Sequence, residues 1–190
     1  LKNYPWLAKS ETKIEQKTSL YLAIEKENIE IIKLLLTNDK FDINIGYINL
    51  SKSKFDYKYK NDSKYVFEEY KYEKTTLYAA IEKRNVIIAK LLLEYDKIDI
   101  NIAYKWSSSS YCSPSKISES NEMTALYCAI EKGQIEIIKL LLANDKLDIN
   151  IGYKWFNESC MSKSESEKTS LYGAIEKGNI EIVKLLLTSD

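Results

Sequence analysis

Apolar and polar residues follow a helical pattern in a segment that occurs four times along the chain. In the copy that begins at Thr124, Leu126, Ala129 and Ile130 are spaced as on one face of a short helix. Gly133 follows where a residue with positive φ would end that helix and reverse the chain. We therefore predict a short helix, a tight turn and a second, antiparallel helix in each copy, which we call a block.

The second predicted helix has a broad apolar stripe, formed in this block by Ile135, Ile138, Leu141 and Leu142. Glu136 and Lys139 lie three residues apart and are expected to pair on the exposed side. Asn144 and Asp145 favour a turn after this helix. Residues 148–150 are then expected to begin an extended segment.

The ends of the first helix are also predicted by residue type. Threonine is a favourable N-cap residue, and it occurs at Thr18, Thr75, Thr124 and Thr169. The turn after this helix has glycine at Gly133 and Gly178, but Glu27 and Arg84 take that place in the other two blocks. Because a Cβ atom disfavours positive φ, we expect slight strain at Glu27 and Arg84.

The blocks resemble ankyrin repeats. The family pattern of Thr-Pro-Leu-His, a small pair, Gly, Glu-Ile-Val-Lys-Leu-Leu-Leu and Asp-Val-Asn is matched by residues 124–127, Gly133, 136–142 and 148–150. The resemblance implies a mainly α fold, an α-solenoid of stacked helix-turn-helix repeats with long β-hairpin or loop fingers. It also implies a non-catalytic scaffold that binds a partner protein through its fingers and concave surface.

The blocks depart from the family pattern at three places. The family's proline is replaced by Ser19, Thr76, Ala125 or Ser170, which removes the preset φ of proline. Its histidine is replaced by Tyr21, Tyr78, Tyr127 or Tyr172, so any hydrogen bond of that histidine must be replaced or lost. A large residue follows the second helix as a wedge between blocks, namely Phe41, Ile98 or Leu147.

The distances between blocks predict the domain organisation. They exceed the roughly 33 residues of an ordinary ankyrin repeat, and the surplus precedes each threonine, where the fingers are expected. We expect one array over residues 1–190, divided into a finger of a preceding repeat (1–17), repeat 1 with a long finger (18–74), repeat 2 (75–123), repeat 3 (124–168) and a truncated repeat 4 (169–190). The chain is therefore expected to be a fragment of a longer array.

The three fingers are expected to differ. In the first, Phe55, Tyr57 and Tyr59 alternate with charged residues, residues 61–63 offer a turn, and Tyr65 and Phe67 alternate on the way back, which predicts an extended hairpin. In the other two, alternation predicts a short strand at the root, with one face formed by Ile100, Ile102, Tyr104 and Trp106, or by Ile149, Ile151, Tyr153 and Trp155. Serine-rich residues 107–110 and 162–167 then predict mobile loops.

Composition excludes several functions. The 28 basic and 28 acidic residues balance, so neither nucleic acid nor an anionic membrane is an expected partner. No apolar run approaches the roughly 20 residues of a membrane span, and no leader is recognisable at the start. The absence of histidine removes the commonest general base and zinc ligand, so neither catalysis nor a cofactor is expected. These features predict an intracellular, cytoplasmic protein.

Three cysteines do not suggest a disulfide framework. Cys128 takes the place of Leu22, Ala79 and Gly173 in the other blocks, so we expect a small buried thiol. Cys112 and Cys160 occupy nearly matching points of consecutive fingers. A cross-link between these fingers is an alternative to two free thiols.

Aromatic residues of the fingers are the candidate partner contacts. The exposed Glu-Lys pair at the end of the first helix, Glu131 and Lys132 in the third block, is the same in every block. Selectivity for a partner is therefore expected from the fingers. The candidates are Tyr57, Tyr59, Tyr65, Phe67, Tyr70, Tyr72, Tyr104, Trp106, Tyr153, Trp155 and Phe156. Two alternatives stay open. Trp106 and Trp155 could stack from finger to finger and stiffen the row, and the aromatics of the first finger could pack on one another.

Three hypotheses about function follow. The first is a protein-binding scaffold for a partner of unknown identity. The second is a structural component of a cytoskeletal or membrane-skeleton assembly. The third is a targeting arm of a larger enzyme or channel.

Overall fold

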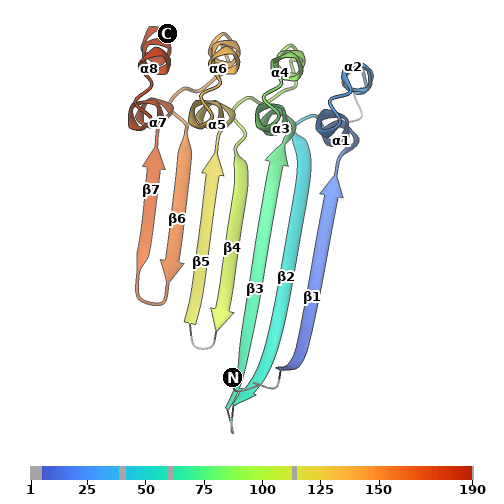
Figure 1. The fold of residues 1–190 in the computed structure, drawn as a ribbon, viewed down its shortest axis with the longest axis vertical. Helices are drawn as coiled ribbons and strands as arrows, with labels where there is room; N and C mark the ends of the chain where they lie inside the picture. Colours follow the sequence, from blue (N-terminus) through green and yellow to red (C-terminus); the bar gives the residue numbers. More distant parts are fainter. Residues whose placement is uncertain (1–5, 39–41, 60–61, 113–114, 190) are drawn as a thin grey trace.

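Two rows of helices lie at one end of a single β-sheet in the computed structural model, which describes residues 6–38, 42–59, 62–112 and 115–189 (Figure 1). The inner helices, next to the sheet, are α1 (Ser19–Glu25), α3 (Thr76–Glu82), α5 (Ala125–Glu131) and α7 (Ser170–Glu176). The outer helices are α2 (Ile29–Leu36), α4 (Val86–Leu93), α6 (Ile135–Leu142) and α8 (Ile180–Thr188). Each block thus contributes the predicted pair of helices.

The predicted helix ends are confirmed. The hydroxyl oxygen of Thr124 accepts a hydrogen bond from the backbone N–H of Tyr127, and the other three threonines cap their helices in the same way. The turn residues Gly133 and Gly178 have φ of 62° and 67°. Glu27 and Arg84 adopt the same conformation, at 53° and 56°, despite their Cβ atoms.

The core lies between neighbouring helix pairs. Ile81 and Ile130 of the inner helices and Ile88 and Ile138 of the outer helices are almost fully buried. Ile137, which lies outside the predicted stripe, is buried as well, because the preceding block covers this side of α6. Its equivalent in the first block, Ile31, is 47% exposed, whereas its equivalent in the last block, Ile182, is fully buried. Each block therefore buries its apolar residues against its neighbours, as a stacked array requires.

The sheet has seven strands in sequence order, and every neighbouring pair is antiparallel. They are β1 (Trp6–Lys17), β2 (Ile45–Tyr59), β3 (Asp62–Thr75), β4 (Tyr104–Cys112), β5 (Ser115–Met123), β6 (Tyr153–Ser159) and β7 (Lys163–Lys168). The helices stand at one end of the sheet, and no described element lies over its two faces (Figure 1).

The prediction of a mainly α solenoid is wrong. Strands and helices take up comparable shares of the chain, and the fingers join into one sheet rather than standing as separate projections. The physical reason is that the return strand of each finger pairs with the outgoing strand of the next. Backbone hydrogen bonds between fingers thus extend the sheet across all blocks.

The predictions for individual fingers have mixed outcomes. The first finger is a hairpin of β2 and β3, as predicted, although Asn61 of its expected turn lies outside the described residues. The prediction of loops in the serine-rich segments is wrong, because residues 107–110 lie within β4 and residues 163–167 lie within β7. Serine has little strand preference of its own, but pairing satisfies its backbone groups, on both sides of β4 and on one side of β7.

The extended segment expected at residues 148–150 is a turn, and β6 starts only at Tyr153. The Asp148 carboxylate accepts a hydrogen bond from the N–H of Asn150 at 2.9 Å, and β4 is likewise preceded by a turn of Asp99 and Asn101. The Asn101 amide also reaches the next block, accepting from the N–H of Asp148 and donating to the carbonyl of Lys146. The Asp-Ile-Asn segment therefore holds neighbouring blocks together. Of the expected wedge residues, Ile98 is buried and Leu147 half-buried, while Phe41 lies outside the described residues.

Candidate functional site

A tyrosine pair recurs where each finger meets its inner helix, a place that we call a joint. The tyrosine of the inner helix stacks on the first tyrosine of the following strand. The ring centroids lie 5.4, 4.5 and 5.5 Å apart in the pairs Tyr21–Tyr47, Tyr78–Tyr104 and Tyr127–Tyr153. The tyrosine that replaces the family's histidine therefore contributes ring stacking across the joint.

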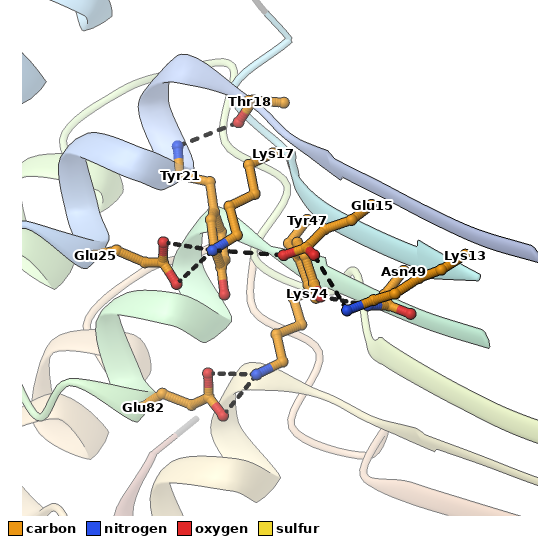
Figure 2. A network of polar contacts seen from close by, with 10 residues as sticks. All are labelled: Lys13, Glu15, Lys17, Thr18, Tyr21, Glu25, Tyr47, Asn49, Lys74 and Glu82. Carbon is orange, nitrogen blue, oxygen red and sulfur yellow. Dashed lines mark hydrogen bonds and ion pairs between the residues drawn. The ribbon is translucent and has the colours of Figure 1, made fainter. Parts of the chain in front are cut away.

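An ion pair lies beside a tyrosine ring in three of the four blocks, and Figure 2 shows two of them, Lys17 with Glu25 and Lys74 with Glu82. Lys17, the last residue of β1, donates to both carboxylate oxygens of Glu25 at 3.3 and 3.0 Å. Lys74 does the same to Glu82 at 3.0 and 2.8 Å. Lys168 and Glu176 repeat the arrangement in the fourth block.

These lysines also lie over tyrosine rings. The Lys17 Nζ atom is 5.5 Å from the ring centroid of Tyr47, and the Lys74 Nζ atom is 5.7 Å from that of Tyr78. The hydrogen bond that Lys17 donates to Glu25 raises the pKa of this lysine above its usual value. The first two joints therefore each combine two rings, a carboxylate and an ammonium group, whereas Lys168 and Glu176 lie beside the single ring of Tyr172.

The third joint differs. Met123 stands where the other blocks have lysine, directly before the capping threonine. Its glutamate, Glu131, is instead paired with Lys177 of the next block, whose Nζ atom is 2.8 Å from one carboxylate oxygen. A cavity of about 480 Å³ lies here, lined by Met123, Tyr127, Glu131, Tyr153, Lys168, Glu176 and Lys177.

Burial perturbs the tyrosines of the joints. It raises the pKa of Tyr78 far above the ordinary value, and it raises the pKa of Tyr104 to about 12. Burial likewise raises the pKa values of Tyr127 and Tyr153. These phenols are therefore neutral near pH 7, and they serve as rings and hydrogen-bonding groups rather than as bases.

One face of the sheet carries a row of large aromatic rings, and we call it the palm face. Tyr72 pairs with Trp106 across β3 and β4, with ring centroids 6.4 Å apart. Asn121 follows on β5 and Trp155 on β6, in the same register. Because directly paired residues share a face, these rings point to the same side, and Tyr70 joins them two residues from Tyr72.

The other predicted contacts are divided by the register. Tyr104 and Tyr153 belong to the palm face but lie under the inner helices, in the joints. Phe67 and Phe156 are on the opposite face. Three further candidates lie in β2 and β3, but their side chains are outside the described part of the structure: Tyr57, Tyr59 and Tyr65.

The two tryptophans do not stack on each other. Asn121 separates them in the register, and Trp106 contacts Tyr72 instead. The indole N–H of Trp155 donates to the Glu119 carboxylate at 3.2 Å. Trp106 therefore does contact the neighbouring finger, but its partner there is Tyr72 rather than the other tryptophan.

Sequence reasoning missed features of the opposite face. Tyr111 is paired with Phe67 and half exposed. A row of alternating charge also crosses this face in register, formed by Glu73, Lys105, Glu122, Lys154 and Glu167. Ion pairs of 3.1 and 2.9 Å join Lys105 to Glu122 and Lys154 to Glu167. The sequence feature that could have predicted this charged row is the lysine directly before both Trp106 and Trp155.

The cysteines do not form a site. Cys128 is buried, as predicted, and burial raises its pKa to about 12, which keeps the thiol protonated. Cys160 is free and exposed. The side chain of Cys112 lies outside the described residues, so the alternative of a cross-link between fingers stays untested.

Comparison with protein families agrees with the repeated helix pairs. A model of three ankyrin repeats matches residues 50–153 and 109–190. The chain belongs to the ankyrin-repeat family. Ankyrin repeats are in general protein-interaction modules and are typically not catalytic. A search of curated proteins gave no significant match. Within the described residues, no helix is long and apolar enough to cross a membrane.

Proposed function

We propose that this ankyrin-repeat chain binds a partner protein along its palm face. The observation that carries the proposal is the row of Tyr72, Trp106 and Trp155, half-buried rings on a sheet face that no described element covers. Large aromatic rings give contact area at low entropic cost and dominate protein interfaces. The four joints border this row and supply charged groups at its edge.

The palm face also differs along the array, whereas the helices hardly do. On β3 and β4, Tyr72 is paired with Trp106, but Tyr70 is paired with Ser108, and Ser110 follows on the same face of β4. A partner therefore meets ridges of aromatic side chains separated by small polar ones. Such a surface distinguishes partners by shape, while the repeated helices hold the strands in register. We keep Tyr57, Tyr59 and Tyr65 as predicted contacts of the same finger.

Two matched triple variants test this proposal. Y70S/W106S/W155S removes rings from the palm face, and F67S/Y111S/F156S removes as many from the opposite face. Each protein is used as bait in affinity purification from the source cells, and partners retained by the wild type are quantified by mass spectrometry. Circular dichroism shows whether each variant is folded.

We expect the palm-face variant to lose at least one wild-type partner by about tenfold or more, as hot-spot residues do. The opposite-face variant should retain that partner. If a folded palm-face variant keeps every partner of the wild type, the proposal is wrong. Loss of the same partners from both variants would also contradict it, because the effect would not belong to one face.

A further inference from the structure

The joints repeat one arrangement in the four blocks, with two stacked rings in the first three and the single ring of Tyr172 in the fourth. Three of them contain a lysine of their own. Lys17, Lys74 and Lys168 each donate to a glutamate of the inner helix with both carboxylate oxygens engaged. Each ammonium group also lies 5.2–5.7 Å from a tyrosine ring centroid. The repeated chemistry shows what this arrangement holds: a cation between a carboxylate and an aromatic face.

The third joint has methionine in place of that lysine, and its glutamate is paired with Lys177 of the next block instead. Met123 pairs in the sheet with Tyr153, just as Lys17 pairs with Tyr47. The rings of Tyr127 and Tyr153 are stacked as in the first two joints. Methionine has a similar length to lysine but no charged end, so the place of the ammonium group is open, in a cavity of about 480 Å³.

We infer that this cavity receives an arginine or lysine side chain of the bound partner protein. The inference rests on the proposed function, because the cavity adjoins the palm face and the partner supplies the cation. The incoming group would lie over Tyr153 and donate to Glu131, as Lys17 lies over Tyr47 and donates to Glu25. A planar guanidinium group suits both contacts, because it stacks on rings and donates in pairs.

Two lysines, Lys168 and Lys177, already line the cavity. Each is paired with a glutamate, so their charges are compensated and a further cation is not repelled strongly. Lys168 is held by both oxygens of Glu176. Lys177 contacts one oxygen of Glu131, and nearly half of its side chain is exposed to solvent. Such exposed ion pairs contribute little, so an arginine can displace or share this contact. An anion would meet two lysines that are already paired with carboxylates, together with the negative faces of two rings.

The test uses the full chain and a small probe, Nα-acetyl-arginine methylamide, with the citrulline analogue as its uncharged counterpart. Binding is followed by amide chemical shifts in ¹H–¹⁵N spectra. In the wild type we expect saturable shifts at Met123, Tyr127 and Tyr153, with a Kd on the order of 1 mM for so small a ligand. The citrulline analogue should bind at least tenfold more weakly.

The deciding variant is M123K, which restores the lysine of the other blocks. Its own ammonium group should occupy the cavity, so binding of the arginine probe should fall at least tenfold while the protein remains folded. M123L, of similar size but uncharged, should bind the probe as the wild type does. Equal binding by M123K and wild type, or absent binding by the wild type, would overturn the inference.

The probe also separates this inference from the proposed function. If inorganic phosphate shifts these residues and the arginine probe does not, the cavity is an anion site and the inference fails. If the probe does not bind but the palm-face variant still loses its partner, only this inference fails. If the probe binds and M123K blocks its binding, while the palm-face variant keeps every partner, the cavity is a cation site but the proposed binding of a partner along the palm face is wrong.

Discussion

Tyrosine at the histidine position of the ankyrin pattern changes the contact between helix and finger. Tyr78 stacks on Tyr104 with ring centroids 4.5 Å apart, and both rings are largely shielded from water. This contact is absent from the family pattern as matched here, and it has a consequence for stability at alkaline pH.

Replacing Tyr104 with phenylalanine should reduce the loss of stability at high pH. Burial raises the pKa of Tyr104 to about 12, above the ordinary value of 10. Between pH 10 and pH 12, Tyr104 ionises in the unfolded chain but stays protonated in the folded one, so the free energy of unfolding falls with pH. Below pH 10 the phenol is protonated in both states and this loss is absent. The wild type should therefore lose up to about 2 kcal/mol relative to Y104F over this interval. Urea unfolding between pH 8 and pH 11.5 measures the difference, and a constant difference would contradict the prediction.

At the scale of the element, the root of each strand is set by a close approach of two backbones. The N–H of Thr124 donates to the carbonyl of Gly152 at 3.0 Å, and Thr18 does the same to Gly46. A Cβ atom on Gly152 would lie 2.1 Å from the carbonyl oxygen of Lys168. The glycine therefore permits β6 to pass β7 at the joint. Block 2 has Ala103 at this position.

Replacing Gly152 with alanine should destabilise the fourth block. The added methyl group overlaps backbone atoms, so β6 or β7 must move, at a cost of about 1–3 kcal/mol. The matched control is A103G, which should cost less than about 1 kcal/mol from added chain entropy alone. Urea unfolding at pH 7 compares the two variants, and a G152A protein as stable as A103G would refute this account.

For the whole molecule, stacking protects the middle blocks better than the last. Ile175 exposes 61% of its surface, whereas the equivalent Ile130 exposes 1%. Leu187 is similarly open, at 68%. In a stacked array each block contacts only its neighbours, so a block with one neighbour opens at a lower free energy.

We expect faster amide exchange in α7 and α8 than in residues 75–142. The helices of the fourth block should open locally, while those of the second and third open only with much of the array. Native-state hydrogen exchange of the 190-residue chain measures this, with the fully buried Ile81 and Ile130 as internal references. Uniform protection across all four blocks would show that the array unfolds as one unit.

The sequence by itself determined the helices, their caps and the strained turns. These features depend on residues close in the chain, such as Thr124 with Tyr127, or the residue of positive φ after each inner helix, which is glycine in two of the blocks. The ankyrin relationship followed from the same local pattern. Residue type also indicated that the fingers carry large aromatic side chains, as Trp106 and Trp155 do.

Only the tertiary structure decided the sheet and the composition of the palm face. Strands such as β5 are rich in serine and charged residues, and they form because β4 of the same finger and β6 of the next finger satisfy their backbone hydrogen bonds. The register then places Trp106 beside Tyr72 and sends Phe156 to the opposite face, since a shift of one residue would reverse every side chain. Pairing between residues tens of positions apart cannot be read from local periodicity, and it is this pairing that gathers the rings on one side.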